Sequence, residues 1–184
     1  MRKFLGRKVL LALGAIVLSL GASASSARAG FTIDQLINGT ANGSMTTAGV
    51  TYVGTGFGVI VGDKLFDNFS YTPTGDMPAP TGVNVTGIND IFGNIGIRFQ
   101  GGFNDSPFTV GPSDALITYK VTVLDPNSVI TDAHIFGNPA IVAGTGILSV
   151  VETFSGQPNV LVIQASRNGI TPPTAYLSDL SFFA

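Results

Sequence analysis

The residues of this chain best suited to chemistry are its aspartates, which number ten against a single glutamate, Glu152. Several lie close to one another or to asparagine. Calcium takes about six to eight oxygen ligands from such side chains, from backbone carbonyls and from water. The candidate clusters are Asp63 with Asp67 and Asn68, Asn89-Asp90, and Asn104-Asp105 with Asp114, and the candidate calcium ligands are Asp63, Asp67 and Asp105. Turn formation is the alternative interpretation, because short Asp and Asn side chains also bond the neighbouring backbone.

Catalytic residues are sparse. His134, the sole histidine, shares one face of an expected strand with Asp132, and we interpret it as structural. Glu152 could act in a carboxylate pair only if the fold brought an aspartate to it. The chain has no cysteine, which excludes thiol catalysis and zinc–thiolate sites. The sequence therefore predicts a protein that is not an enzyme and has no cofactor other than calcium. A hydrolase using Glu152 or His134 is the weaker alternative.

Short strands are the elements that would have to position these side chains. After residue 30 the chain is rich in Gly, Thr, Asn, Val and Ile, and strand-like runs alternate with turn residues. In the clearest run, 115–124, Ile117 and Tyr119 alternate with Thr118 and Lys120. The pattern predicts an all-β fold, an antiparallel β-sandwich of the jelly-roll kind with about eight or nine strands. The expected strands are 57–61, 64–71, 83–88, 95–99, 115–124, 129–136, 146–154, 160–166 and 175–183.

Other segments have local patterns of their own. Residues 33–37 fit one short helical turn, and the small, polar residues 39–49 fit a loop. Within 64–71, Leu65, Phe69 and Tyr71 fall on one face, and Phe66 breaks the alternation. The tetrapeptide Ile-Phe-Gly-Asn occurs at 91–94 and again at 135–138, and we interpret both copies as a turn that leads into a strand.

The first 29 residues have the pattern of an export signal. Four basic residues precede an apolar run at 9–20, and Ala27-Arg28-Ala29 offers small residues for cleavage before Gly30. The run is shorter than the roughly 20 residues that span a bilayer. A retained anchor is the alternative. The sequence thus predicts a signal peptide at 1–29 and a single secreted domain at 30–184.

Charge narrows the range of partners. Beyond residue 29 the chain keeps four cations, Lys64, Arg98, Lys120 and Arg167, against all eleven acidic residues, a formal charge of −7. Nucleic-acid affinity comes largely from clustered Lys and Arg, so nucleic acid is not a predicted partner. An anionic membrane is disfavoured for the same reason.

Part of the chain resembles a known family. The most specific part is the run Lys64-Leu65-Phe66-Asp67-Asn68-Phe69-Ser70-Tyr71, and stretches at 94–99, 113–119 and 144–152 extend the similarity over most of 62–154. These residues resemble the ectodomain of bacterial PEP-CTERM exported proteins. The resemblance implies an exported, β-rich surface or matrix protein of exopolysaccharide-producing bacteria. The resemblance does not imply anchoring at the cell surface, because the sorting motif that ends those proteins does not occur in this sequence.

Export, strand pattern and resemblance together predict a non-enzymatic surface or extracellular-matrix protein, secreted or held at the cell surface. Its expected partners are extracellular polysaccharide or other surface proteins. The alternative function is a calcium-dependent carbohydrate-binding module.

Overall fold

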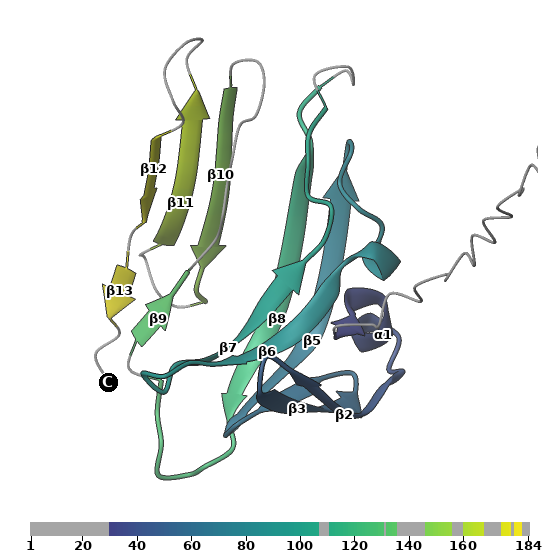
Figure 1. Ribbon diagram of the computed structural model, residues 1–184, viewed down its shortest axis with the longest axis vertical. Helices are drawn as coiled ribbons and strands as arrows, with labels where there is room; N and C mark the ends of the chain where they lie inside the picture. The colour runs from purple at the N-terminus through teal and green to yellow at the C-terminus, as the bar shows by residue number, and fades with distance from the viewer. Residues whose placement is uncertain are drawn as a thin grey trace, which may run out of the picture.

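The computed structural model of the chain describes residues 30–106, 111–130, 132–135, 146–155, 160–167, 174–177 and 179–181. Within them lie thirteen strands, and every strand pairing is antiparallel. The expected all-β sandwich is confirmed (Figure 1). Eight of the described strands have six residues or more, and the other five are shorter. The expected signal peptide at 1–29 lies outside the described residues.

Four groups of strands make up the fold. The main sheet has the order β2-β3-β4-β5-β8, with β2 (Ala41–Thr47), β3 (Val50–Gly56), β4 (Val59–Val61), β5 (Lys64–Thr74) and β8 (Asp114–Val123). The small sheet has the order β1-β6-β7, with β1 (Phe31–Thr32), β6 (Asn84–Asn89) and β7 (Ile95–Gln100). The C-terminal sheet has the order β10-β11-β12, with β10 (Gly146–Thr153), β11 (Val160–Arg167) and β12 (Thr174–Leu177). The last group is the pair of β9 (Asp132–His134) with β13 (Asp179–Ser181).

The main sheet and the small sheet enclose the core between them. Phe31 of the small sheet meets Tyr52 of the main sheet edge to face, with ring centroids 5.9 Å apart. Further along, Phe99 of β7 approaches Tyr119 of β8 at 5.8 Å. In β8 the alternation holds as the sequence predicts, because Thr118 and Lys120 are exposed. Ile117 and Tyr119 turn inward and pack against the core. Period-two patterning therefore builds the two-layer core.

The short α-helix α1 (Ile33–Ile37) closes one side of the sandwich and confirms the helical turn expected at 33–37, and one 3-10 turn, η1 (Pro80–Gly82), precedes β6. Helix α1 begins with a capping box. The Thr32 hydroxyl accepts a hydrogen bond from the Gln35 backbone at 3.2 Å, and the Gln35 side chain accepts one from the Thr32 backbone at 2.9 Å. Ile33 and Leu36 point into the core and are fully buried. Burial of these two side chains compensates for the low intrinsic stability of so short a helix.

The loop expected at 39–49 is wrong, because most of this segment forms the edge strand β2. A two-residue turn, Ala48-Gly49, joins β2 to β3, and both turn residues have positive φ, 51° and 83°. Two successive residues of positive φ give the turn whose twist matches that of a β-hairpin. The close pairing of β3 with β2 leaves no room for a side chain at Gly54, since a Cβ added there would lie 2.4 Å from the carbonyl oxygen of Ala41.

The side of the strand on which each residue of 64–71 is expected to lie needs one correction. Phe66 and Phe69 are both buried, although their spacing puts them on opposite faces of a regular strand. The pairing of β5 with β8 shifts by one residue between Asp67 and Ser70, which marks a β-bulge. Asn68 lies in the bulge with φ of 55°, a conformation that Asn tolerates better than most residues. The bulge turns Phe66 inward in place of Leu65.

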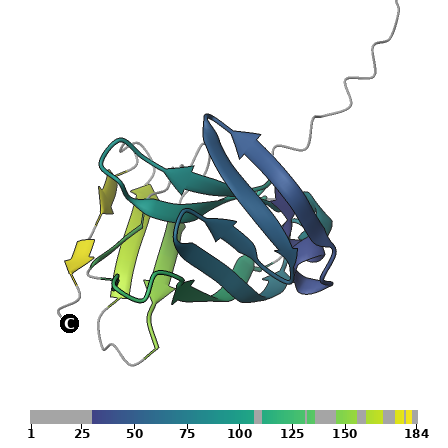
Figure 2. The ribbon, with the colours of Figure 1, turned by 90° about the horizontal axis from the view of Figure 1, so that it is seen from below.

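The C-terminal sheet lies at the opposite side of the sandwich from α1 in both views (Figures 1 and 2). Leu161 and Ile163 of β11 are buried. A hydrogen bond of 2.7 Å from the Tyr119 hydroxyl of β8 to Glu152 of β10 ties this sheet to the main sheet. In the described part of the chain, no helix has the length and apolarity that a membrane span requires.

Candidate functional site

Asp63, the first candidate calcium ligand, lies in the turn between β4 and β5, where both of its carboxylate oxygens contact the ammonium of Lys64. The two Nζ–O distances are 2.7 Å and 2.9 Å. The backbone carbonyl of Asp63 also accepts a hydrogen bond of 2.7 Å from the Leu124 amide, just after β8. A calcium ion at this carboxylate would have to displace the lysine.

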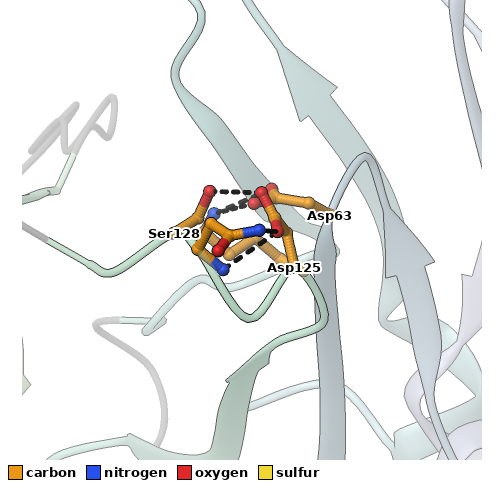
Figure 3. Close-up of polar contacts among 5 residues, drawn as sticks. Asp63, Asp125 and Ser128 are labelled. Atoms are coloured by element: carbon orange, nitrogen blue, oxygen red, sulfur yellow. Dashed lines mark hydrogen bonds and ion pairs between the residues drawn. The ribbon is translucent and has the colours of Figure 1, made fainter.

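Beside this ion pair, the chain turns sharply after β8 around Asp125 (Figure 3). Asp125 Oδ1 accepts a hydrogen bond of 3.0 Å from the backbone amide of Asn127, and Oδ2 accepts one of 2.7 Å from the Ser128 hydroxyl. The Asn127 amide, the Ser128 hydroxyl and, more weakly, the charge of Lys64 lower the pKa of Asp125. This carboxylate therefore serves as the acceptor that holds the turn.

The other two candidate ligands lie elsewhere. Asp67 sits on β5 opposite Lys120, and its buried Oδ1 has no hydrogen-bond donor among the described residues. Asp105 accepts a hydrogen bond of 2.7 Å from the Ser113 hydroxyl, near the end of β5 opposite to Asp63. The 11 residues of β5 span more than about 30 Å, so Asp63 and Asp105 cannot share one ion. Across the described ranges, no three His, Cys, Asp or Glu side chains are grouped so that they could hold a metal.

A calcium titration tests this geometry. Because Asp63 and Asp105 already accept hydrogen bonds at separate places, we expect about 1 mM calcium to shift the thermal midpoint by less than about 1 °C relative to chelator. Differential scanning fluorimetry of the full chain measures the shift. A rise of several degrees, abolished by Asp63→Asn or Asp105→Asn, would show that calcium binds at these residues.

The two residues considered for catalysis lie on different strands. His134 is in β9, paired with Asp179 of β13, and its side chain lies outside the described residues. Glu152 is half-buried on β10 and accepts the hydrogen bond from Tyr119. Burial, followed by the charge and hydrogen bond of Glu152, raises the pKa of Tyr119 well above its usual value. This pair joins two sheets and gives Glu152 a structural partner.

The most unusual surface feature is one that the sequence reasoning interpreted only as a turn. Ile91 and Phe92, at the tip of the β6–β7 hairpin, are 93% and 82% exposed, more than any other large apolar side chain in the described part. The second copy of the tetrapeptide, at 135–138, lies almost wholly outside the described residues. Exposed apolar patches are typical of protein or membrane interaction sites, which makes this tip a candidate for one.

Asp90 gives this tip a fixed shape. Its Oδ1 accepts hydrogen bonds of 2.9 Å from the backbone amides of Phe92 and Asn94, and its Oδ2 accepts one of 2.8 Å from the Asn94 side chain. These contacts, led by that of the Asn94 side chain, lower the pKa of Asp90. Gly93 supplies the φ of 85° that the turn requires. The tip is thus a braced turn with two apolar side chains outward.

Further exposed apolar residues lie at the same end of the molecule. The β4–β5 turn contacts the base of the β6–β7 hairpin, since a Cβ at Gly62 would lie 2.7 Å from Ile95, and it also bonds the amide of Leu124. Figure 1 shows the β6–β7 turn and the segment after β8 at this end. We call the set the apolar loop end: Ile91, Phe92, Leu124, Val129 and Ile130, which are 93%, 82%, 46%, 62% and 41% exposed.

Comparison of the chain with protein-family models, with curated proteins and with solved structures finds no match.

The brace at the hairpin tip predicts a local effect. Replacing Asp90 with Ala removes the acceptor of two backbone amides, so we expect the amides of Phe92 and Asn94 to exchange with deuterium at least about tenfold faster. The thermal midpoint should change little, because Asp90 is fully exposed. Asp114→Ala is the control, since the Asp114 carboxylate also accepts a hydrogen bond from a backbone amide, that of Ala115, at the other end of the sandwich. Unchanged exchange at the tip of the Asp90 variant would contradict the brace.

Proposed function

We propose that this chain is an exported, non-enzymatic protein of the cell surface or extracellular matrix, which works by non-covalent adhesion. The N-terminal pattern of residues 1–29 and the resemblance to PEP-CTERM ectodomains support export. The apolar loop end is the observation that carries adhesion, because it displays large apolar side chains on turns that the fold holds in place.

Adhesion fits the way the sandwich is built. The core between the two sheets is closed with Tyr52, Val59 and Val61 fully buried, so the exposed apolar residues are not left over from a loosely packed interior. Exposing Ile91 and Phe92 costs solubility, and the hairpin could form with polar residues at both positions. Their presence is therefore best explained by a contact that buries them.

Cell fractionation tests export and location. In cells of the source organism we expect the protein in the extracellular or surface fraction, sensitive to protease in intact cells, with an N-terminus near Gly30. An intact, protease-protected cytosolic protein that retains residues 1–29 would overturn the proposal.

The alternative function, a calcium-dependent carbohydrate-binding module, rests on the aspartate-rich loops. Co-sedimentation of the protein with extracellular polysaccharide of the source organism, in calcium and in chelator, separates the two. Retention in calcium alone, lost in Asp63→Asn or Asp105→Asn variants, would favour the module. Retention that ignores calcium fits a matrix protein in contact with polysaccharide, and no retention directs the search for partners to proteins.

A further inference from the structure

We propose that the apolar loop end docks into a protein partner that offers an apolar recess bordered by Lys or Arg side chains. This inference deepens the proposed function, because it names the kind of partner that adhesion would use. Three properties of the loop end, namely its exposure, its rigidity and its charge, define the partner.

Exposure defines the shape of the partner surface. Ile91 and Phe92 are 93% and 82% exposed, so their own chain covers less than a fifth of either side chain. A flat surface would touch one side of such a projecting tip and leave the rest in water. Only a concave site can surround both side chains, and full burial of an aromatic or a branched aliphatic residue contributes about 1.5–3 kcal/mol each. The partner therefore has a recess at this point.

Rigidity favours recognition by a preformed site. The tip is held by three hydrogen bonds to the Asp90 carboxylate, and the neighbouring turn is held by the bonds of Asn127 and Ser128 to Asp125. Loops that are already ordered lose little conformational entropy on binding, which leaves more of the apolar contact energy for affinity. The two braced turns display their apolar residues at the same end of the molecule in this way.

Charge decides between a protein and a membrane. The loop end carries the carboxylates of Asp63, Asp90 and Asp125, against one ammonium, that of Lys64. Asp90 directly precedes Ile91, so insertion of the tip into a bilayer would bring an ionised carboxylate towards the hydrocarbon, which is costly. Anionic lipids would also repel a face with this balance. A recess with a basic rim pairs with the same carboxylates and directs the encounter.

The test places a photo-crosslinking residue, benzoylphenylalanine, at Phe92 of the full chain, expressed in cells of its source organism. The control carries it at Thr118, an exposed position on the outer face of β8. Adducts are identified by mass, and any protein captured is purified and titrated against the unmodified chain and its variants. Flotation with vesicles of phosphatidylethanolamine and phosphatidylglycerol is measured in parallel.

We expect one protein adduct from position 92 and none from position 118. We also expect the reconstituted Kd to rise at least about 30-fold in Phe92→Ser, as for a central contact residue. Leu116→Ser removes an apolar side chain that is 58% exposed on β8, and it should leave the Kd unchanged. Raising the salt concentration should weaken binding several-fold, because the carboxylates contribute.

Several results would overturn the inference. They are an adduct with lipid, an adduct with a second copy of the chain, the absence of any adduct, or a Kd that Phe92→Ser leaves unchanged. Vesicle flotation that depends on Phe92 would show a membrane to be the partner. The test is separate from the proposal of export: a cytosolic protein that keeps Phe92-dependent binding refutes export alone. A surface protein without a Phe92 adduct refutes docking alone.

Discussion

Replacing Tyr52 with Ala should lower the free energy of unfolding by about 4 kcal/mol, within the range measured for large aromatic residues cut from a core. Tyr52 is fully buried and packs edge to face against Phe31 at 5.9 Å. Its ring also fills the space above Gly87, where an added Cβ would lie 2.9 Å from Cδ1. The variant would leave a cavity between the two sheets that their backbones cannot close. Urea denaturation followed by circular dichroism measures the loss.

A conservative variant separates the ring from its hydroxyl. The Tyr52 hydroxyl lies 3.0 Å from the Thr47 hydroxyl, and Tyr52→Phe removes that hydrogen bond but keeps the packing. We expect Tyr52→Phe to cost about 1 kcal/mol, a typical net value for one hydrogen bond. If Tyr52→Ala cost no more than Tyr52→Phe, the main and small sheets would not be packed around this residue as described.

The sequence allowed the fold to be predicted where a segment's own pattern decides its structure. The alternation in β8 and the helical turn at 33–37 depend on neighbouring residues, and both are confirmed. The expected strands include neither β3 (Val50–Gly56) nor β2, whose residues, Ala41–Thr47, are small and polar and carry no strand pattern. Pairing with β3 makes this segment a strand, and a partner in space cannot be read from composition.

The candidate site was harder to predict, because it is assembled from separate loops. Asp63, Asp67 and Asp105 are candidates by residue type alone, and the fold places the first and last near opposite ends of β5. The apolar loop end joins residues more than thirty positions apart. Their exposure depends on whether other parts of the folded chain cover them, which the sequence pattern does not give. One usable signal was present. Asp90 ahead of Gly93-Asn94 is typical of a turn held by an Asp side chain, and such a turn leaves the residues inside it pointing outward.

Replacing Tyr119 with Phe should lower the free energy of unfolding by about 2 kcal/mol at pH 7, since it removes a hydrogen bond to a charged carboxylate group. Tyr119 packs against Phe66, Phe69 and Phe99 with ring centroids 6.2, 5.9 and 5.8 Å away, and its hydroxyl donates to Glu152 at 2.7 Å. Phe keeps the ring contacts and leaves Glu152 without its donor. Glu152→Gln is the matched control, because an amide oxygen still accepts the bond, and it should cost less.

The same hydrogen bond predicts how stability changes at high pH. Burial and the Glu152 carboxylate raise the pKa of Tyr119, so this residue keeps its proton in the folded chain at a pH where it is ionised in the unfolded chain. The contribution of Tyr119 to the free energy of unfolding is therefore fully present below pH about 10, the ordinary pKa of tyrosine. It is lost as the pH rises beyond that value. The slope reaches about 1.4 kcal/mol for each pH unit above that point.

Burial also raises the pKa of Tyr71, which adds a further slope that Tyr119→Phe leaves in place. Urea denaturation between pH 8 and pH 11, from roughly two units below the onset of the loss to one unit above it, should show a steeper loss for the unmodified chain than for Tyr119→Phe. Equal slopes for the two proteins would mean that Tyr119 is open to water and that the hydrogen bond to Glu152 does not join the main sheet to the C-terminal sheet.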